Sequence, residues 1–236
     1  MPVSPVQIRP WPFHPPARRF GGDPRTPTIE VDASGDLTAQ LLLRAYCNGL
    51  FPMAEHRRGA IRWFSPSQRG VLPLASFHVP RRLRRRVRQA PFTVTMDRAF
   101  AEVIRACAEP RGTEGETWIN DEIIDACAAL HRAGLAHSVE AWSGCDGGTT
   151  ARPVLVGGIY GVALGGAFFG ESMFSRSTDA SKICLVHLVE HLRRSGFVLF
   201  DVQYVNPHLE QFGVTSVPRE TYMRDLAPAL AMEARW

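Results

Sequence analysis

Three polar side chains in the C-terminal half of the chain stand in apolar surroundings and could act together. Glu171 follows a Gly-rich apolar segment, and Asp201 and Gln203 stand two residues apart within another apolar segment. Residues i and i+2 of a β-strand point to the same face, so Asp201 and Gln203 are predicted to project together. Burying an unpaired carboxylate is costly. Asp201 is therefore either a hydrogen-bonded structural residue or, with Gln203 and Glu171, part of an active site.

A dense run of arginines precedes these residues in the chain. The net charge is only +4, and all 27 basic residues except Lys182 are arginines. The run contributes Arg81, Arg82, Arg84, Arg85, Arg86 and Arg88. The planar guanidinium group suits contact with phosphate. The run predicts either a solvated basic helix face or a contact for nucleic acid or acidic lipid. It lacks the interleaved aromatic residues of a single-strand platform, which favours a duplex backbone.

Length and composition restrict the class of protein. The chain has 236 residues, 45% of them hydrophobic and 21% charged, as is typical of a globular protein with a real core. No apolar run approaches the roughly 20 residues of a membrane span, and the Pro-rich start lacks the apolar region of a signal peptide. We therefore expect a cytoplasmic protein with no membrane contact.

Cysteine and histidine spacing gives no support to a metal site. The five cysteines are scattered without ligand spacing, which indicates reduced thiols rather than disulfides or zinc ligands. His187 and His191 stand four residues apart, but no H-E-x-x-H motif surrounds them. We interpret them as a surface pair on a helix and expect neither a metal nor another cofactor.

The spacing of apolar and capping residues predicts the elements that position the polar groups. In the larger, C-terminal part the predicted order is β-α-α-β-β-β-α-β-α-β, which indicates an α+β fold with helices over a mixed sheet. Asp97 and Asn120 are predicted to cap the first two of these helices. Residues 177–181 begin a long amphipathic helix, and residues 197–203 form the strand that carries Asp201.

Three parts are predicted along the chain. Residues 1–34, rich in Pro, Arg and Gly, are expected to form an irregular extension. Residues 35–74 are expected to form a small N-terminal α/β domain, which begins with a helix capped by Asp36. Residues 75–236 form the larger domain, and no repeats are present.

A collinear set of short segments resembles the leucyl/phenylalanyl-tRNA–protein transferase family. In chain order the segments are A-Y at 45–46, G-L-F-P at 49–52, W-F-S-P at 63–66, G-E-T-W-I at 115–119, H-S-V-E-A-W at 137–142, L-V-G-G-I-Y-G-V-A at 155–163, G-E-S-M-F-S-R at 170–176, A-S-K at 180–182 and D-x-Q at 201–203. Each segment alone is weakly specific. Together they cover roughly residues 35 to 222 with family-like spacing, and the set is very specific.

The resemblance implies a fold and an activity. The larger domain is expected to be GNAT-like, a mixed sheet flanked by helices. The activity is transfer of Leu, Phe or, less well, Met from aminoacyl-tRNA to the N-terminal Arg or Lys of a protein, which marks that protein for degradation. A monomer without a cofactor is expected. Asp201 and Gln203 would be the catalytic pair, with the carboxylate orienting the Gln amide, and Glu171 would bind the cationic acceptor residue or order the pair.

The resemblance also implies binding sites for the donor. The aminoacyl side chain would enter an apolar pocket formed by Ile159, Phe168, Met173, Leu185, Leu188, Leu192 and Phe200. Each of these residues, taken singly, is more commonly plain core. The terminal adenine would stack on Trp118 or on Tyr46. Many family members carry Trp where this chain has Met53. The arginine run would contact phosphates of the acceptor stem.

Three alternative functions agree less well with the sequence. A GNAT acetyltransferase that uses acetyl-CoA would need a Q/R-x-x-G-x-G/A loop to hold pyrophosphate, and the sequence has none. An RNA-binding protein without catalysis would not need Glu171, Asp201 and Gln203 together. A sister enzyme that acts on acidic N-termini would not need an acidic acceptor site.

Overall fold

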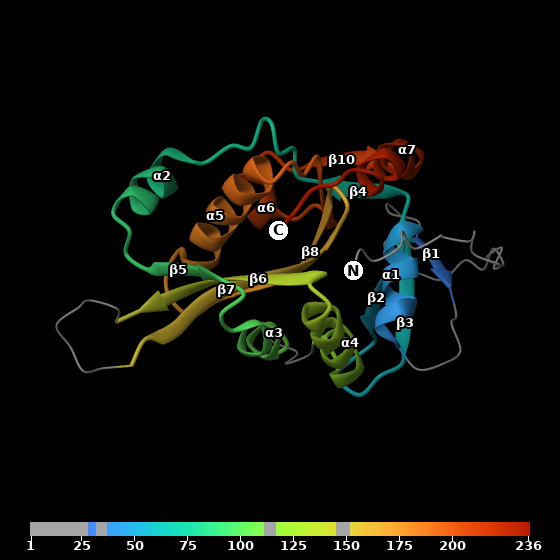
Figure 1. The fold of residues 1–236 in the computed structure, drawn as a ribbon, viewed down its shortest axis with the longest axis horizontal. Helices are drawn as coiled ribbons and strands as arrows, with labels where there is room; N and C mark the ends of the chain where they lie inside the picture. Colours follow the sequence, from blue (N-terminus) through green and yellow to red (C-terminus); the bar gives the residue numbers. More distant parts are fainter. Residues whose placement is uncertain (1–27, 32–36, 111–116, 145–151) are drawn as a thin grey trace, which may run out of the picture.

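A seven-stranded mixed sheet forms the centre of the molecule (Figure 1). The structure is a computed structural model that describes residues 28–31, 37–110, 117–144 and 152–236. In sheet order the strands are β10 (Thr215–Pro218), β4 (Gln68–Val71), β9 (Leu199–Gln203), β8 (Ala167–Ser175), β7 (Val154–Leu164), β6 (Ala136–Ser143) and β5 (Thr93–Met96). Only β8 and β9 run parallel, and every other neighbouring pair is antiparallel.

Helices cover both faces of this sheet, as Figure 1 shows. On one face lie α3 (Phe100–Cys107) and α4 (Asp121–Arg132), whose apolar residues share a core cluster with the N-terminal unit and with α7 (Arg219–Leu230). On the other face α5 (Ala180–Arg194) packs in a second core cluster. The central strands β7 and β8 read as long apolar runs because both of their faces are covered.

The second core cluster also receives two short helices. Leu83 of α2 (Arg81–Arg88) and Leu209 of α6 (Pro207–Glu210) are buried there. The structure is therefore the α+β arrangement predicted from the sequence, a mixed sheet flanked by helices, and it fits the expected GNAT-like fold. No helix of the described residues is long and apolar enough to cross a membrane.

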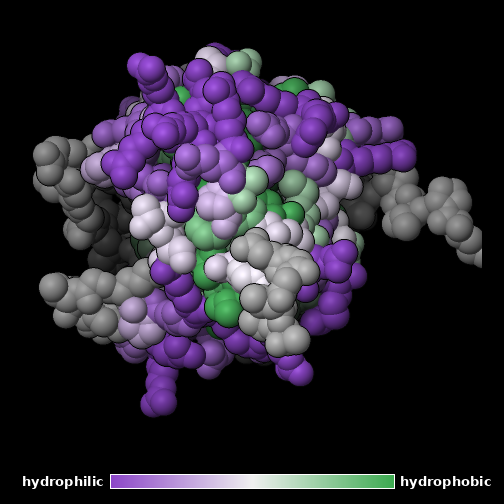
Figure 2. Space-filling model, turned by 90° about the vertical axis from the view of Figure 1, so that its left-hand side faces the viewer, coloured by the Kyte–Doolittle hydropathy of each residue, from purple (hydrophilic) through white to green (hydrophobic). Residues whose placement is uncertain are grey.

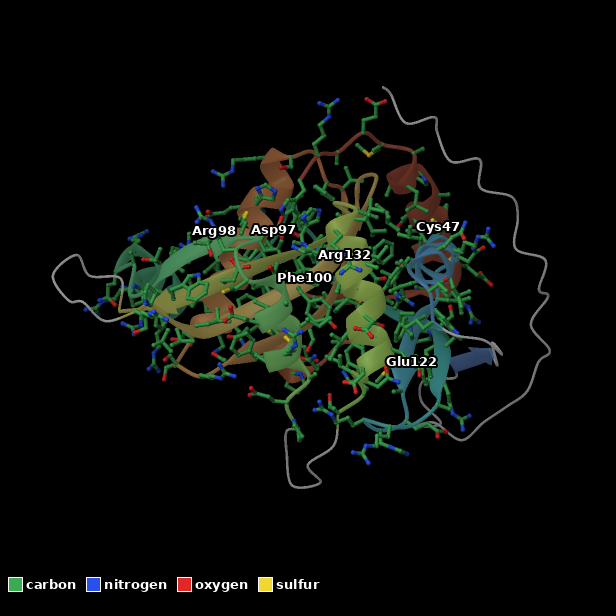
Figure 3. The ribbon with its side chains drawn as sticks, turned by 60° about the horizontal axis from the view of Figure 1, so that its bottom comes forward. Cys47, Asp97, Arg98, Phe100, Glu122 and Arg132 are labelled. Carbon is green, nitrogen blue, oxygen red and sulfur yellow. The ribbon has the colours of Figure 1, made fainter. Side chains whose placement is uncertain are left out.

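A small unit at the N-terminal end packs beside the large sheet. Its three-stranded sheet has the order β1 (Thr28–Val31), β3 (Ile61–Pro66) and β2 (Phe51–Ala54), and α1 (Ala39–Cys47) covers it. In Figure 3, α4 lies between α3, which carries Phe100, and α1, which carries Cys47. The predicted domain of residues 35–74 also included residues 68–71, and these form β4 in the large sheet. Most of the predicted irregular extension, residues 1–27, lies outside the described residues.

Capping explains where several helices begin, and two predicted caps differ from those in the structure. The Asn120 side chain accepts from the Ile123 N–H at 3.0 Å, as predicted. Asp97 does not cap α3, because its carboxylate accepts from the Ser138 N–H at 2.8 Å and bonds the His137 ring. Asp36 lies outside the described residues, and Thr38 caps α1 instead.

Candidate active site

The parallel strands β8 and β9 part before they end, and a cavity of about 410 Å³ opens between them. Their pairing stops at Phe169 and Asp201, although β8 continues to Ser175 and β9 to Gln203. The cavity is lined by residues 170–173 of β8, by Phe200, Val202 and Gln203 of β9, by Ile159 of β7, by Leu185 of α5 and by residues 206–209 around α6. A partly apolar pocket with a few converging polar groups is a typical ligand site.

Glu171 enters this opening because β8 contains a β-bulge. Tyr160 of β7 pairs with Ser172, and the next residue, Gly161, pairs with Gly170. Glu171 is therefore the extra residue, and such bulges re-aim a side chain beside functional sites. Its Oε1 atom is enclosed and has no hydrogen-bond partner among the described residues.

The surroundings of Glu171 favour its protonated form. Burial raises the pKa of Glu171 to about 7. The neighbouring Tyr46 hydroxyl and the more distant Arg69 lower this pKa, whereas Asp201 raises it. The Tyr46 hydroxyl lies outside hydrogen-bonding geometry and has no partner of its own among the described residues. Glu171 is thus a carboxyl group that can bind or release a proton near neutral pH.

Asp201 has the opposite surroundings, because donors occupy both of its oxygens. Oδ1 accepts from Arg69 Nε and from the Gln203 backbone N–H, both at 2.9 Å. Oδ2 accepts from Arg69 Nη2 at 2.6 Å and from the Tyr222 hydroxyl at 2.8 Å. Asp201 is fully buried and does not line the cavity. Its carboxylate has no oxygen free to take a proton from a substrate.

Gln203 lies in the cavity wall, and its backbone explains how it differs from Asp201. Gly70 pairs with Gln203 and Val71 pairs with Asp201, so Val202 is an extra residue in β9. Gln203 itself has a left-handed backbone with φ +57°. For a residue other than glycine this conformation costs on the order of 1–3 kcal/mol. Its Nε2 atom is enclosed and has no hydrogen-bond partner among the described residues.

This bulge overturns two predictions about the pair. Asp201 and Gln203 do not project together, because the regular i, i+2 alternation fails at Val202. The Asp201 carboxylate bonds the backbone N–H of Gln203 rather than its side-chain amide. Asp201 therefore orients the backbone of Gln203.

Sequence reasoning missed Arg69. Its side chain is 1% exposed, and its guanidinium carbon lies 4.7 Å from the Phe51 ring centre and 4.6 Å from the Tyr222 ring centre. The partner Asp201 is 132 residues away in the chain. The only local signal is an arginine directly before the apolar Gly70 and Val71.

Comparison with known proteins identifies the family of the chain. Residues 71–227 match the family model of leucyl/phenylalanyl-tRNA protein transferase, and residues 35–67 match the model of its N-terminal domain. The chain belongs to the leucyl/phenylalanyl-tRNA–protein transferase family. The family is one of aminoacyltransferases, and the resemblance predicted from the sequence is confirmed.

Individual relatives agree with the family models. The leucyl/phenylalanyl-tRNA–protein transferase of Salinibacter ruber is 52% identical over 85% of this chain and 84% of its own length. That of Paramagnetospirillum magneticum is 54% identical over 85% of this chain and 92% of its own length. The crystal structure of FemX is similar at a TM-score of 0.49 and 12% identity, over 81% of this chain and 70% of that chain.

The structure brings four of the seven apolar residues that the family resemblance implied for the donor pocket to the cavity. Ile159, Met173, Leu185 and Phe200 line it. Phe168, Leu188 and Leu192 do not line it and are buried in the core cluster between α5 and the sheet.

The cavity is also lined by polar residues that the sequence analysis did not assign to it. They are Ser172, Asn206 and His208. Burial and then the neighbouring Lys182 lower the pKa of His208.

The two expected adenine-stacking residues differ in their exposure. Tyr46 is fully buried, and its ring lies 4.8 Å from that of Phe169, so it has no face open to a base. Trp118 is partly exposed, and its carbonyl accepts from the Ala54 N–H at 3.0 Å. Trp118 therefore lies beside the end of β2, the strand that carries Met53. Residues 115–116 of the same motif lie outside the described residues.

The arginine run forms helix α2 at the edge of the molecule. Its apolar Leu83 is buried, whereas Arg81, Arg82, Arg84, Arg85 and Arg88 are exposed and Arg86 is partly exposed. Figure 2 shows the face of the molecule on which α2 lies, with hydrophilic side chains gathered over its upper half. Among the described residues no carboxylate pairs with these arginines. Their charge is available to a partner.

The described residues contain no group of three or more His, Cys, Asp or Glu side chains that could hold a metal ion. Four of the cysteines, Cys47, Cys107, Cys127 and Cys184, are free thiols. Cys145 lies outside the described residues.

Proposed function

We propose that this protein transfers Leu, Phe or Met from aminoacyl-tRNA to the N-terminal Arg or Lys of an acceptor protein, in the cavity between β8 and β9. Family membership carries the reaction class. The cavity is consistent with the proposed substrates, because apolar residues and a carboxyl group with an unpartnered oxygen both line it. Marking of the acceptor for degradation follows from the same proposal.

The donor side chain would occupy the apolar part of the cavity. Ile159, Leu185 and Phe200 form a wall without charge, and Met173 adds a flexible side chain that adapts to Leu, Phe or Met. The ester carbonyl would then lie at the polar end, near Gln203. The unpartnered Gln203 Nε2 is suited to donate to the oxyanion that forms as the amine attacks.

Glu171 is proposed to receive the acceptor amine. The cationic N-terminal residue approaches a carboxyl group whose Oε1 is unpartnered. The amine nitrogen attacks the ester carbon as a C–N bond forms. The ester C–O bond breaks, and its electron pair leaves with the ribose oxygen. The proton lost by the amine passes to Glu171, whose pKa of about 7 suits a general base at neutral pH.

The tRNA is proposed to contact α2 through its phosphates. Such contacts position a nucleic acid without reading its sequence, which suits an enzyme that accepts several tRNA species. Reversing the charge of Arg84 and Arg85 should weaken tRNA binding about tenfold and flatten its dependence on salt. The matched control reverses Arg105 and Arg132, exposed residues on α3 and α4. An unchanged salt slope in the α2 variant would remove α2 from the tRNA site.

The alternative of acetyl transfer from acetyl-CoA is not favoured. The segment that opens α5, residues 177–181, has no Gly-x-Gly sequence to approach a pyrophosphate. Family membership also assigns the chain to tRNA-dependent transferases. A thermal-shift titration with CoA should leave the melting temperature unchanged.

The deciding experiment offers radiolabelled Leu-tRNA together with peptides that begin with Arg, Lys, Asp or Ala. Label is expected on the Arg and Lys peptides alone. If no peptide is labelled, the proposed function is contradicted. Label on the Asp peptide would instead indicate an enzyme for acidic N-termini.

A further inference from the structure

Arg69 is the centre of a buried cluster that joins four parts of the fold. It lies on β4, and its Nη1 donates to the Gly49 carbonyl at 2.9 Å, just after α1. Its guanidinium stacks between Phe51 of β2 and Tyr222 of α7. Its Nε and Nη2 donate to the two oxygens of Asp201 on β9, at 2.9 Å and 2.6 Å. Arg69 therefore connects both the small N-terminal unit and the last helix to the end of β9.

The last link in this cluster reaches the cavity. Asp201 Oδ1 accepts from the backbone N–H of Gln203, the residue that holds the left-handed conformation. Such a conformation persists only where the surrounding structure over-determines it. Asp201 can act as this anchor only while Arg69 and Tyr222 hold its carboxylate in place. Neither Arg69 nor Tyr222 lines the cavity.

We propose that Arg69 and Tyr222 are positioning residues of the transfer reaction. They act through Asp201, which holds the Gln203 backbone, to keep the side-chain amide of Gln203 in the cavity. The proposal rests on the proposed function, since Gln203 is assigned to the reacting ester there. Their effect should fall on the rate of transfer rather than on binding of the donor, because neither side chain touches the cavity.

Tyr222→Phe is the informative variant, because it removes one donor to Asp201 and keeps the ring that stacks on Arg69. We expect kcat to fall about fivefold with KM for aminoacyl-tRNA unchanged. Tyr160→Phe is the matched control, since the Tyr160 hydroxyl has no hydrogen-bond partner among the described residues. That control should transfer at the wild-type rate.

A double-mutant cycle separates positioning from general stability. If Tyr222 acts through Gln203, then Tyr222→Phe has no further effect on the residual rate of a Gln203→Ala enzyme. The same fivefold loss in that background would overturn the proposal. Arg69→Lys keeps the charge but loses the two-pronged contact, and it should follow the same pattern with a larger loss in kcat.

Hydrogen exchange supplies a readout that does not depend on activity. Tyr222→Phe should speed exchange of the Gln203 backbone N–H, followed in a peptide that covers residues 199–205, whereas Tyr160→Phe should not. Unchanged exchange in Tyr222→Phe would overturn the proposal even if the rate fell. A wild-type enzyme that transfers nothing to any peptide would instead remove the proposed function itself.

Discussion

Glu171 and Asp201 lie on the neighbouring parallel strands β8 and β9, close to where the strands part, yet their surroundings are opposite. Asp201 is fully buried and receives four hydrogen bonds, two of them from a guanidinium group. Glu171 lines the cavity with an Oε1 that has no partner among the described residues. A carboxylate whose two oxygens both accept hydrogen bonds stabilises the fold, whereas one with an unpaired oxygen can bind a ligand or a proton. The comparison supports an anchoring role for Asp201 and the proposed proton-accepting role for Glu171.

Glu171→Gln tests the chemical half of the comparison and should have the largest effect on the reaction. The amide keeps the size of the side chain but cannot take a proton. We expect single-turnover transfer to fall about 100-fold or more at pH 8, since general bases contribute roughly 10²–10⁴ in rate. Binding of aminoacyl-tRNA, measured by filter retention, should stay close to that of the wild type. A loss of less than threefold would remove Glu171 as proton acceptor.

Asp201→Asn tests the anchoring half. The Asn oxygen can still accept from the Gln203 N–H, so transfer should fall only about tenfold. The fold should suffer more, because Arg69 loses its buried counter-charge. We expect the free energy of unfolding to fall by about 3–5 kcal/mol, measured by urea denaturation. An intact fold with transfer abolished would show that Asp201 takes part in the chemistry.

The dependence of stability on pH should test the raised pKa of Glu171 next. The pKa of Glu171 is raised from an ordinary value of 4.5 to about 7, so folding favours its protonated form. This contribution is complete below about pH 4.5 and is lost as the pH rises through about 7. Glu171→Gln should therefore increase the free energy of unfolding above pH 7 by about 2 kcal/mol and leave it unchanged near pH 4. Equal curves for variant and wild type would contradict the raised pKa.

Tyr46→Phe should have the smallest effect. The Tyr46 hydroxyl lowers the pKa of Glu171, so its removal should raise that pKa. In the proposed reaction Glu171 must be ionised, so the midpoint of the pH–rate profile should move to higher pH while the plateau rate stays near that of the wild type. The Glu171→Gln enzyme provides the baseline, because its residual profile reports the acceptor amine alone. A midpoint that moves to lower pH would contradict the assigned role of Tyr46.

Local signals predicted much of the fold and the chemistry-bearing residues. Asn120 caps the helix that the sequence assigned to it, because an N-cap is a contact within three residues. Apolar periodicity predicted β9 and α5. Glu171 and Gln203 could be selected from the sequence because each is a polar residue within an apolar segment. Both line the cavity.

The features that separate Asp201 from Gln203 depend on contacts distant in sequence. The bulge at Val202 forms where β9 meets Gly70, and a Cβ on Gly70 would come within 2.9 Å of the Tyr204 carbonyl carbon. Arg69 meets Asp201 because β4 and β9 are neighbours in the sheet, and the spacing of residues along the sequence does not predict this order of strands. Helix α7, which supplies Tyr222, has weak periodicity and was not predicted.

The stacking of Arg69 between β2 and α7 limits how the protein can be divided or recombined. Residues 37–66 resemble an exchangeable module, since they form most of a separate small sheet. Yet they supply the Gly49 carbonyl and the Phe51 ring to a cation that belongs to the large sheet. A chimaera with this segment from a relative should keep both groups, and a fragment that begins at β4 should leave Arg69 open to water on one side.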